Sequence, residues 1–350
     1  GRVQRISVQE SLMQTSLATV LLLIVCCAAV GDCQDSVAPQ PPDQTVMVIS
    51  PEAVLKSGSD VVGKARRGDV LSGREVNGEW LWIPAARGWI QQKNVLPVDQ
   101  AVQHFSTVIE QEPSAQAYFQ RATARLALGQ PAEAVRDLTR VIELDQKNVL
   151  ALNERGTTYR QLGKLAAAKA DFDAVIAGGV RHPAVLTNRA LVQIDQGTTE
   201  SVEAALADLR TALQIDSRFA PAWEASAQIR ERAGVYDKAL EYYAVAARLD
   251  PAFVLAWNNR AWILATAPDA KFRDGSQAVQ CATQACELTD YQAADLLDTL
   301  AAALAEAGQF EQAVVRARQA LEKADAGQQD MLAARLKLYE SGKPFHQPQR

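Results

Sequence analysis

Histidine, cysteine and aromatic residues are scarce in this chain. Of its 350 residues, 3 are His and 5 are Cys, and Phe, Trp and Tyr together account for 6%. His104, His182 and His346 stand far apart in the sequence, so a histidine-rich metal site is excluded. Lys and Arg number 36 against 41 Asp and Glu, which gives a net charge of −5. A basic surface for nucleic acid or for an anionic membrane is therefore not expected.

The common catalytic motifs are also missing. The sequence contains no HExxH, no GxSxG, no phosphate-binding loop and no dinucleotide fingerprint. Cys281 and Cys286 are five residues apart in a helical pattern, so their side chains point in different directions and cannot readily form a disulfide. They are expected to be small core residues. We therefore expect a protein that is not an enzyme, with no cofactor and no bound metal.

Long apolar runs are lacking except for one near the N-terminus. Residues 17–30 (LATVLLLIVCCAAV) follow Arg2 and Arg5 and are too few to span a bilayer comfortably, which is typical of a signal peptide. Small residues precede Asp32, so we expect a signal peptide over 1–31 and export to the periplasm or out of the cell. Without cleavage, this segment would anchor the protein in a membrane, and no other membrane contact is expected. Lipidation of a nearby cysteine and a buried helix are the two alternatives.

A linker and a small β unit follow. Residues 32–44 include three prolines and no apolar periodicity, which predicts an extended linker. Residues 45–98 switch to short β-branched and aromatic runs separated by glycine, which indicates a small all-β unit. Asn77 and Gly78 are the preferred pair of a type I′ turn, so a hairpin is expected there. The predicted strands cover 46–49, 61–65, 70–76, 79–84 and 88–91.

The β unit resembles the bacterial SH3-like domains, because the segments GEWLWI, RGWI and NVLPV follow the order of that family's last strands. The resemblance implies a small β-barrel. Leu81 and Ile83 share one face of their strand and Trp80 and Trp82 share the other, and we expect the aliphatic pair to fill the core. In the SH3 family the first Trp of this strand lines a ligand groove, but the paired tyrosines of that groove are missing here. Two roles stay open for the tryptophan pair: packing on the next domain, or binding a ligand.

From residue 99 onward the sequence is rich in alanine and repeats with a period of 34. A glycine, followed five residues later by an alanine, recurs at Gly129, Gly163, Gly234 and Gly308. Such a period predicts stacked helix pairs, with the glycine ending the first helix in a left-handed conformation. The pattern resembles the tetratricopeptide (TPR) repeat and implies a mainly α solenoid at 99–340. Its six full units are 115–148, 149–182, 183–219, 220–253, 254–293 and 294–327.

A half repeat precedes the first unit. Residues 99–114 have the pattern of a second helix without its first, with Asp99 as the expected cap. We expect the SH3-like barrel to cover this helix and to bury Phe105 together with part of the Trp80 and Trp82 face. The barrel would then serve as the N-terminal cap of the solenoid.

The third and fifth units are longer than the others, with three and five extra residues expected in the turn between their helices. In the fifth unit this turn is 265–277, and Phe272 is expected to fold back into the gap. After the sixth unit, 328–340 is expected to be a closing helix, because its apolar residues are spaced for one face. Residues 341–350 form a tail in which Phe345 is expected to pack while the rest frays.

Charged residues recur at the seventh and twenty-third positions of the units. The first three units carry Arg at the seventh position and Asp at the twenty-third, whereas the fourth and sixth have no Arg at the seventh and no Asp at the twenty-third. The fifth breaks this match, with Arg260 and Cys281 in the two places. A guanidinium that emerges from a seam between helices needs an acceptor, and an Asp on the paired helix can take two of its N–H groups. The predicted ion pairs are Arg121–Asp137, Arg155–Asp171 and Arg189–Asp208.

The TPR resemblance implies a groove lined by the second, fifth, sixth, ninth, twelfth and thirteenth positions of each first helix. The family's clamp for two carboxylates needs Lys or Arg where this chain has Phe119, Ala184 and Asn188, so that clamp is not expected. Asn side chains can hold a peptide backbone through both a donor and an acceptor. The candidate partner-binding residues of the groove are Asn153, Asn188, Glu224, Gln228, Arg232, Asn258 and Asn259.

These patterns predict a non-enzymatic protein–protein interaction scaffold of an exported or cell-envelope protein. A partner peptide or a partner helix would bind in the groove. The alternative is a cell-envelope protein whose β unit binds a cell-wall peptide or glycan through Trp80 and Trp82, with the repeats as a spacer.

Overall fold

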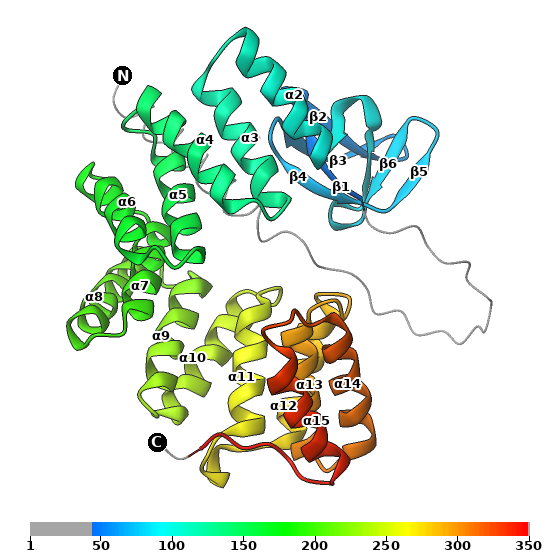
Figure 1. Cartoon of the computed structure of the whole chain (residues 1–350), viewed down its shortest axis with the longest axis vertical. Helices are drawn as coiled ribbons and strands as arrows, with labels where there is room; N and C mark the ends of the chain where they lie inside the picture. Colours follow the sequence, from blue (N-terminus) through cyan, green and yellow to red (C-terminus); the bar gives the residue numbers. More distant parts are fainter. Residues whose placement is uncertain (1–43, 349–350) are drawn as a thin grey trace. The chain divides into compact units, whose positions relative to one another are not determined.

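A computed structural model describes residues 44–348, which fall into two compact units (Figure 1). The first unit ends at Asp195 and the second begins at Gln196. The predicted signal peptide (1–31) and, apart from Gln44, the predicted linker (32–44) lie outside the described residues.

The first unit opens with a small antiparallel β region. One sheet has the strand order β4-β1-β8 and the other has the order β3-β2-β7-β6-β5. Leu55, Leu81, Ile83 and Ile90 meet in a common core, where each is at most 3% exposed. The expected placement of Leu81 and Ile83 in the core is therefore confirmed. The strands are β1 (Gln44–Val48), β2 (Glu52–Ser57), β3 (Asp60–Arg66), β4 (Val70–Gly73), β5 (Glu75–Asn77), β6 (Trp80–Ile83), β7 (Gly88–Gln91) and β8 (Val95–Pro97).

The strands differ from the sequence prediction in three places. β2 is half polar and β8 ends in Pro97, which a strand tolerates at a sheet edge, so neither has a clear sequence pattern. The predicted strand 70–76 is broken at Arg74 into β4 and β5, which belong to different sheets. The hairpin lies one residue later than predicted, because Asn77 already pairs with Trp80. Gly78, with φ +58°, is then the first residue of the loop.

Helices α2–α7 follow the β region, and α8–α15 lie in the second unit. Each of the six first helices begins at its predicted residue, at 115, 149, 183, 220, 254 and 294. The expected mainly α fold, a series of helix pairs preceded by a small β region, is confirmed. The helices are α2 (Val98–Gln111), α3 (Ala115–Ala127), α4 (Pro131–Leu144), α5 (Val149–Gln161), α6 (Leu165–Ala177), α7 (Pro183–Gln196), α8 (Thr199–Ile215), α9 (Ala220–Arg232), α10 (Tyr236–Leu249), α11 (Val254–Thr266), α12 (Gly275–Glu287), α13 (Ala294–Glu306), α14 (Phe310–Lys323) and α15 (Gln329–Glu340).

Glycines and alanines shape the turns inside the helix pairs as predicted. Gly129 and Gly163 have φ angles of +68° and +69°, which side chains with a Cβ rarely adopt. Ala134 and Ala168, five residues later, are both 0% exposed. A larger side chain at either position would push the paired helices apart.

Two local predictions are corrected. The extra residues of the third unit lengthen α8 to 17 residues, and only two residues separate this helix from α7. α2 begins one residue earlier than predicted, after Pro97, so Asp99 lies in the first turn of the helix and not at its cap. An acidic residue in the first turn still interacts favourably with the helix dipole.

The predicted ion pairs of the first two repeats are present. Arg121 donates from Nε and Nη2 to the two carboxylate oxygens of Asp137, at 2.9 and 2.7 Å. Arg155 donates in the same way to Asp171, also at 2.9 and 2.7 Å. The bond to its aspartate raises the pKa of each guanidinium. Because Asp137 and Asp171 are 2% and 5% exposed, these bonds satisfy charges that water hardly reaches.

The arginines at the seventh position of the first three repeats also contact the second helix of the preceding pair. There a hydroxyl or carboxylate oxygen accepts a hydrogen bond from Nη1, so one guanidinium connects neighbouring pairs. The third predicted partner, Asp208, lies in the second of the two compact units, which begins at Gln196, whereas Arg189 lies in the first. The Arg189–Asp208 pair therefore stays a prediction. The bonds between pairs are Arg121–Ser106 (3.0 Å), Arg155–Thr139 (3.1 Å) and Arg189–Asp173 (2.7 Å).

The β region covers the half-repeat helix α2. Phe105 is 2% exposed and packs in a cluster with Met47 of β1, and Leu96 of β8 borders this cluster. The expected burial of Phe105 is confirmed. The expected contribution of the tryptophans is wrong, because the cluster is built from the three-stranded sheet. Trp82 instead packs on Trp89 within the five-stranded sheet, with 5.3 Å between the ring centroids.

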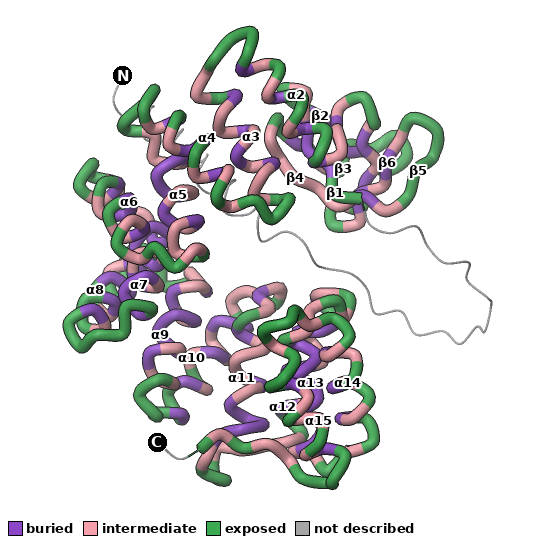
Figure 2. Tube along the Cα trace, in the orientation of Figure 1, coloured by how far each residue is buried: buried purple, intermediate pink, exposed green. Residues whose placement is uncertain are grey.

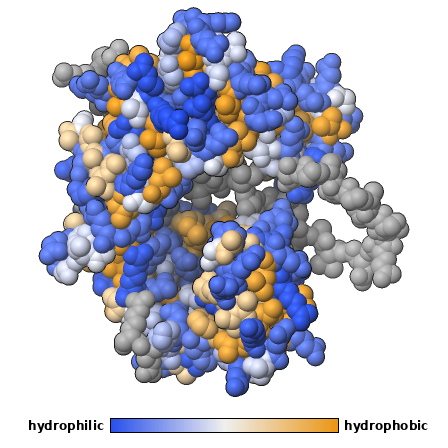
Figure 3. Space-filling model, viewed as in Figure 1, coloured by the Kyte–Doolittle hydropathy of each residue, from blue (hydrophilic) through white to orange (hydrophobic). Residues whose placement is uncertain are grey.

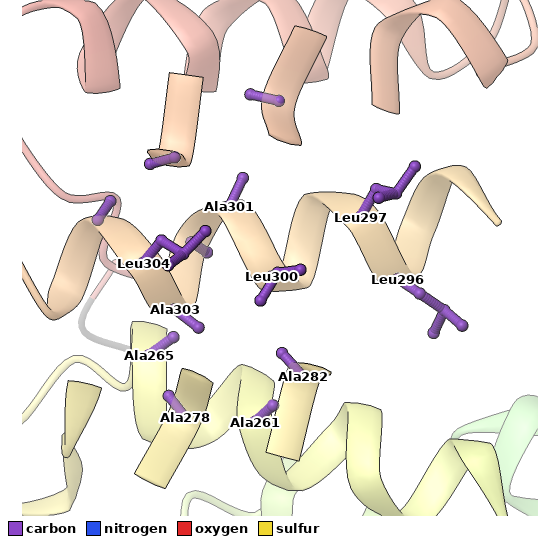
Figure 4. Close-up of a cluster of buried hydrophobic side chains, with 14 of the residues drawn as sticks. Ala261, Ala265, Ala278, Ala282, Leu296, Leu297, Leu300, Ala301, Ala303 and Leu304 are labelled. Carbon is purple, nitrogen blue, oxygen red and sulfur yellow. The ribbon is translucent and has the colours of Figure 1, made fainter. Parts of the chain in front are cut away.

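The core of the second unit is centred on α13, in which residues 296–305 are all buried (Figure 2). Figure 4 shows Leu300 and Ala303 pointing toward Ala261 of α11 and Ala282 of α12. Small residues on these helices allow the close approach. The predicted closing helix is α15, which packs on α14.

Phe272 and the two described cysteines behave as predicted. Phe272 packs against Tyr236 at 5.4 Å between ring centroids, and so fills the gap left by the long turn of the fifth unit. Cys281 and Cys286 are buried in the core and form no disulfide. Burial raises the pKa of both thiols, that of Cys286 to about 12.

Candidate functional site

Four of the predicted groove residues bond to one another between successive first helices. Asn188 Nδ2 donates to Asn153 Oδ1 at 3.1 Å, which connects α7 with α5. Asn259 Nδ2 donates to Glu224 Oε1 at 2.9 Å, which connects α11 with α9. Donor and acceptor are 35 residues apart in both cases. Asn153 and Glu224 are each 3% exposed, so these bonds tie the first helices together.

The remaining predicted groove residues lie on α9 and α11. Gln228 Nε2 donates to Glu224 Oε1 at 2.8 Å, and Asn258 Nδ2 lies 3.3 Å from Asn259 Oδ1. Asn258 Oδ1 is buried and has no hydrogen-bond partner within residues 44–348. Arg232 is exposed at the end of α9. Hydrogen bonds thus connect Glu224 to Gln228 and Asn259, and Asn259 to Asn258, within the second compact unit. The role of the predicted groove residues in binding a partner stays a prediction.

The C-terminal tail contacts predicted groove positions at the ends of α11 and α13. The backbone N–H of Gln347 donates to the backbone oxygen of Thr266 at 2.8 Å, and its Nε2 donates to Thr266 Oγ1 at 2.9 Å. His346 Nε2 lies 2.7 Å from Glu306 Oε2. Thr266 and Glu306 occupy the thirteenth position of their units, which belongs to the predicted groove. The expectation that the polar tail frays is therefore wrong for these two tail residues.

An aromatic and charged cluster holds Phe345. The Phe345 ring lies 6.0 Å from the Trp262 ring, centroid to centroid. The Arg335 guanidinium lies 4.7 Å from the Phe345 ring centroid and 4.8 Å from that of Trp262. Arg335 also donates to the carboxylate of Asp298. Burial raises the pKa of Asp298 to about 6, and the charge of Arg335 opposes this rise.

The sequence reasoning missed these contacts because it selected amide side chains. Trp262 and Thr266 stand at the ninth and thirteenth positions of the fifth unit, which the TPR resemblance already assigns to the groove. The tail alone gave no periodic pattern. Only Phe345 was predicted to pack, and this prediction is confirmed.

Trp80 and Trp82 lie half-buried on β6, on the side of the strand opposite Leu81 and Ile83. Trp82 pairs with Trp89 across the sheet, at an interplanar angle of 54°. Exposed valines stand on the same sheet, with Val61 of β3 59% exposed. On the face drawn in Figure 3, apolar residues form separate patches among hydrophilic ones.

Residues 44–348 include no cluster of three or more His, Cys, Asp or Glu side chains that could hold a metal ion. Within the same range, no helix is both long enough and apolar enough to cross a membrane.

A family model and several known proteins match part of the repeat region. The family model described as "Tetratricopeptide repeat" matches residues 115–148 and 150–177. A segment of 77 residues is 39% identical to DnaJ homolog subfamily C member 3 of Rattus norvegicus, and one of 78 residues is 36% identical to sperm-associated antigen 1 of Mus musculus. Each match covers 22% of this chain but only 15% and 9%, respectively, of those proteins.

Solved structures resemble the chain over a longer stretch. A tetratricopeptide repeat protein from Parabacteroides merdae shares 16% identity over 70% of this chain and 93% of its own, with a TM-score of 0.51. Yeast Tom70 shares 16% identity over 69% of this chain and 50% of its own, with a TM-score of 0.53. The APC/C hetero-tetramer Cut9-Hcn1 shares 12% identity over 69% of this chain and 46% of its own, with a TM-score of 0.56. The chain therefore carries tetratricopeptide repeats at 115–148 and 150–177 and has the helical-pair fold of tetratricopeptide repeat proteins.

Proposed function

We propose that this protein is a non-enzymatic interaction scaffold that binds an extended peptide segment of a partner protein along its first helices. Repeats of this fold present a row of first helices, and side chains from several helices can contact one ligand. The predicted residues Gln228, Asn258 and Asn259, which are only partly buried, would contribute hydrogen bonds to such a peptide.

The observation that carries this proposal is the protein's own tail. Phe345 occupies an aromatic site beside Trp262, while Gln347 is held through both its backbone and its side chain by Thr266. An apolar anchor combined with backbone hydrogen bonds is how a surface recognises an extended segment. A partner segment with an aromatic residue followed by polar ones would take the place of the tail.

The tail gives a direct test. A chain that ends at Gly342 should bind a peptide with the sequence KPFHQPQR, whereas the full chain should bind it at least about 10-fold more weakly, because its own tail is present at a high effective concentration. The same peptide with alanine in place of Phe345 is the matched control and should bind poorly to the shortened chain. Fluorescence anisotropy of the labelled peptide measures both affinities. Equal binding to the two chains, or no binding to the shortened one, would refute the proposal.

Export is part of the proposal and rests on the apolar run at 17–30 after Arg2 and Arg5. The mature protein would begin near Asp32 and act in the periplasm or outside the cell. N-terminal sequencing of the protein from fractionated cells tests this. Protein found in the cytoplasm, or exported protein that still carries Arg2 and lacks membrane attachment, contradicts it.

A second candidate function is binding of a cell-wall peptide or glycan by the β region, which would act as an SH3-like domain. The observation that favours it is the surface of Trp80, Trp82 and Trp89, which the helices leave half-exposed. Separate retention experiments with residues 45–98 and 99–350 distinguish the two functions. Retention of 45–98 on wall material supports the second function, and capture of a partner by 99–350 supports the first.

A further inference from the structure

A cavity lies where the β region meets α2 and α3, within the first unit. Its volume is about 350 Å³, which is in the range of small-ligand sites. The end of β1, the turn after β3 and the residues before β8 form one side, and α2 and the start of α3 form the other.

The rim of the cavity is cationic. Arg67 and Lys93 are exposed lining residues, and none of the residues that line the cavity is acidic. Arg67 Nε donates to the backbone oxygen of Ile49 at 2.8 Å, which holds the guanidinium at the rim. The whole chain carries a net charge of −5, whereas the charged residues of this lining are Arg67 and Lys93. Such a rim attracts anions.

Two buried polar atoms of the cavity wall have no hydrogen-bond partner among the described residues. Gln120 is 3% exposed, and its Nε2 makes no hydrogen bond with any described residue. Ser50 Oγ is also buried without a partner in residues 44–348. A buried donor left unpaired destabilises the fold, so both groups are suited to an acceptor that enters from outside. Both belong to the cavity lining.

The start of α3 adds to the positive potential. Ser114 caps this helix by accepting from the N–H of Ala117, and Gln116 and Ala117 of its first turn line the cavity. A helix N-terminus carries partial positive charge and binds anionic groups.

The remaining wall is apolar and decides which anion fits. Ile49, Phe105, Val108 and Ala117 line the cavity beside the polar groups. A bare inorganic anion would leave this wall in contact with water, whereas a carboxylate attached to a short aliphatic group would cover it. We propose that this cavity binds the C-terminal carboxylate of a peptide whose last residue is aliphatic. The carboxylate accepts hydrogen bonds from Gln120 Nε2 and Ser50 Oγ and pairs with Arg67 and Lys93, and the aliphatic side chain packs on Phe105 and Val108.

Calorimetric titration of the full chain tests this with four probes. N-acetyl-leucyl-leucine is the carboxylate probe, and its C-terminal amide has nearly the same shape without the charge. Isovalerate and inorganic phosphate represent a free small acid and a bare anion. The free-acid peptide should bind at least about 10-fold more tightly than the amide and than either small anion, because only it combines the charge with the apolar contact. Equal binding of acid and amide, tighter binding of isovalerate or phosphate, or no heat with the peptide up to about 5 mM would overturn the proposal.

Variants then assign the binding to this cavity. Lys93→Gln and Arg67→Gln should each weaken binding of the free-acid peptide by about 10-fold. Gln120→Leu removes the buried donor and should weaken binding to a similar extent without lowering the melting temperature, since it also removes an unpaired polar group. Lys56→Gln, at an exposed position of β2 outside the cavity, is the matched control and should bind as the natural chain does. Unchanged affinity in all three cavity variants would overturn the proposal.

Discussion

Removing the carboxylate of Asp171 should destabilise the protein more than any surface change on the same helix. In Asp171→Ala, Arg155 loses the acceptor of two hydrogen bonds, at 2.9 and 2.7 Å, and keeps only Thr139 as a hydrogen-bond partner among the described residues. The Arg155 side chain is 17% exposed, so water replaces these bonds only in part. Bonds to charged groups contribute roughly 1.5–3 kcal/mol each and are not additive, which gives an expected loss of about 3 kcal/mol.

Chemical denaturation followed by circular dichroism measures this loss, and α6 itself supplies the control. Asp173 is on the same helix, two residues later, and its side chain is 40% exposed. Asp173→Ala should cost less than Asp171→Ala, because this carboxylate is more exposed and water can replace part of its bonds to Lys169 and Arg189. The double variant Arg155→Met with Asp171→Leu should recover much of the loss, since it leaves no unpaired charge. The reasoning is refuted when Asp171→Ala is no worse than Asp173→Ala, or when the double variant is as unstable as the single one.

Three further predictions concern other buried groups. Phe105→Ala should cost about 3–5 kcal/mol and favour aggregation, because it opens a cavity under the β region; thermal melting and light scattering measure both, and an unchanged melting curve would contradict the burial. Asp298 should titrate with a midpoint near 6 by carboxyl-carbon NMR. The raised pKa means that protonation favours the folded state, so this stability contribution is complete below about pH 4 and is lost as the pH rises through about 6, by up to about 3 kcal/mol. Asp298→Asn should not show this loss, and equal pH dependence in both proteins would contradict it. Cys286 should resist alkylation at pH 8 until the protein unfolds, as peptide mass mapping can show, because its thiol pKa is about 12; rapid labelling of the folded protein would speak against its burial.

The helical part of the fold was predictable because its determinants are local and periodic. The starts of all six first helices followed from the spacing of Gly129 and its counterparts, and the Arg121–Asp137 pair followed from two positions of the repeat. The strands β2 and β8 were missed because short strands depend on their neighbours for stability. The contacts of Gln347 with Thr266 could not be derived, since they join residues 81 positions apart outside the repeat.

The helical positions of the candidate groove residues were predictable, but the partners of their side chains were not. The offsets placed Asn153 and Glu224 on the first helices, yet the structure shows both buried and bonded to side chains of the neighbouring unit. A sequence pattern cannot tell whether an amide faces a ligand or its own neighbour, because both arrangements place the residue at the same helical offset.

The arginines that join three helices have a consequence for cooperativity. Because Arg121 and Arg155 bond both their own pair and the preceding one, each couples the folding of two adjacent repeats. In a linear array, such nearest-neighbour coupling determines how many repeats open together. The fourth unit has Ser226 in the place of the arginine, and its hydroxyl bonds within its own helix to the Ala222 oxygen. Native-state hydrogen exchange should therefore show the repeats of Arg121 and Arg155 opening as one block, while α9 and α10, whose repeat lacks this arginine, exchange faster.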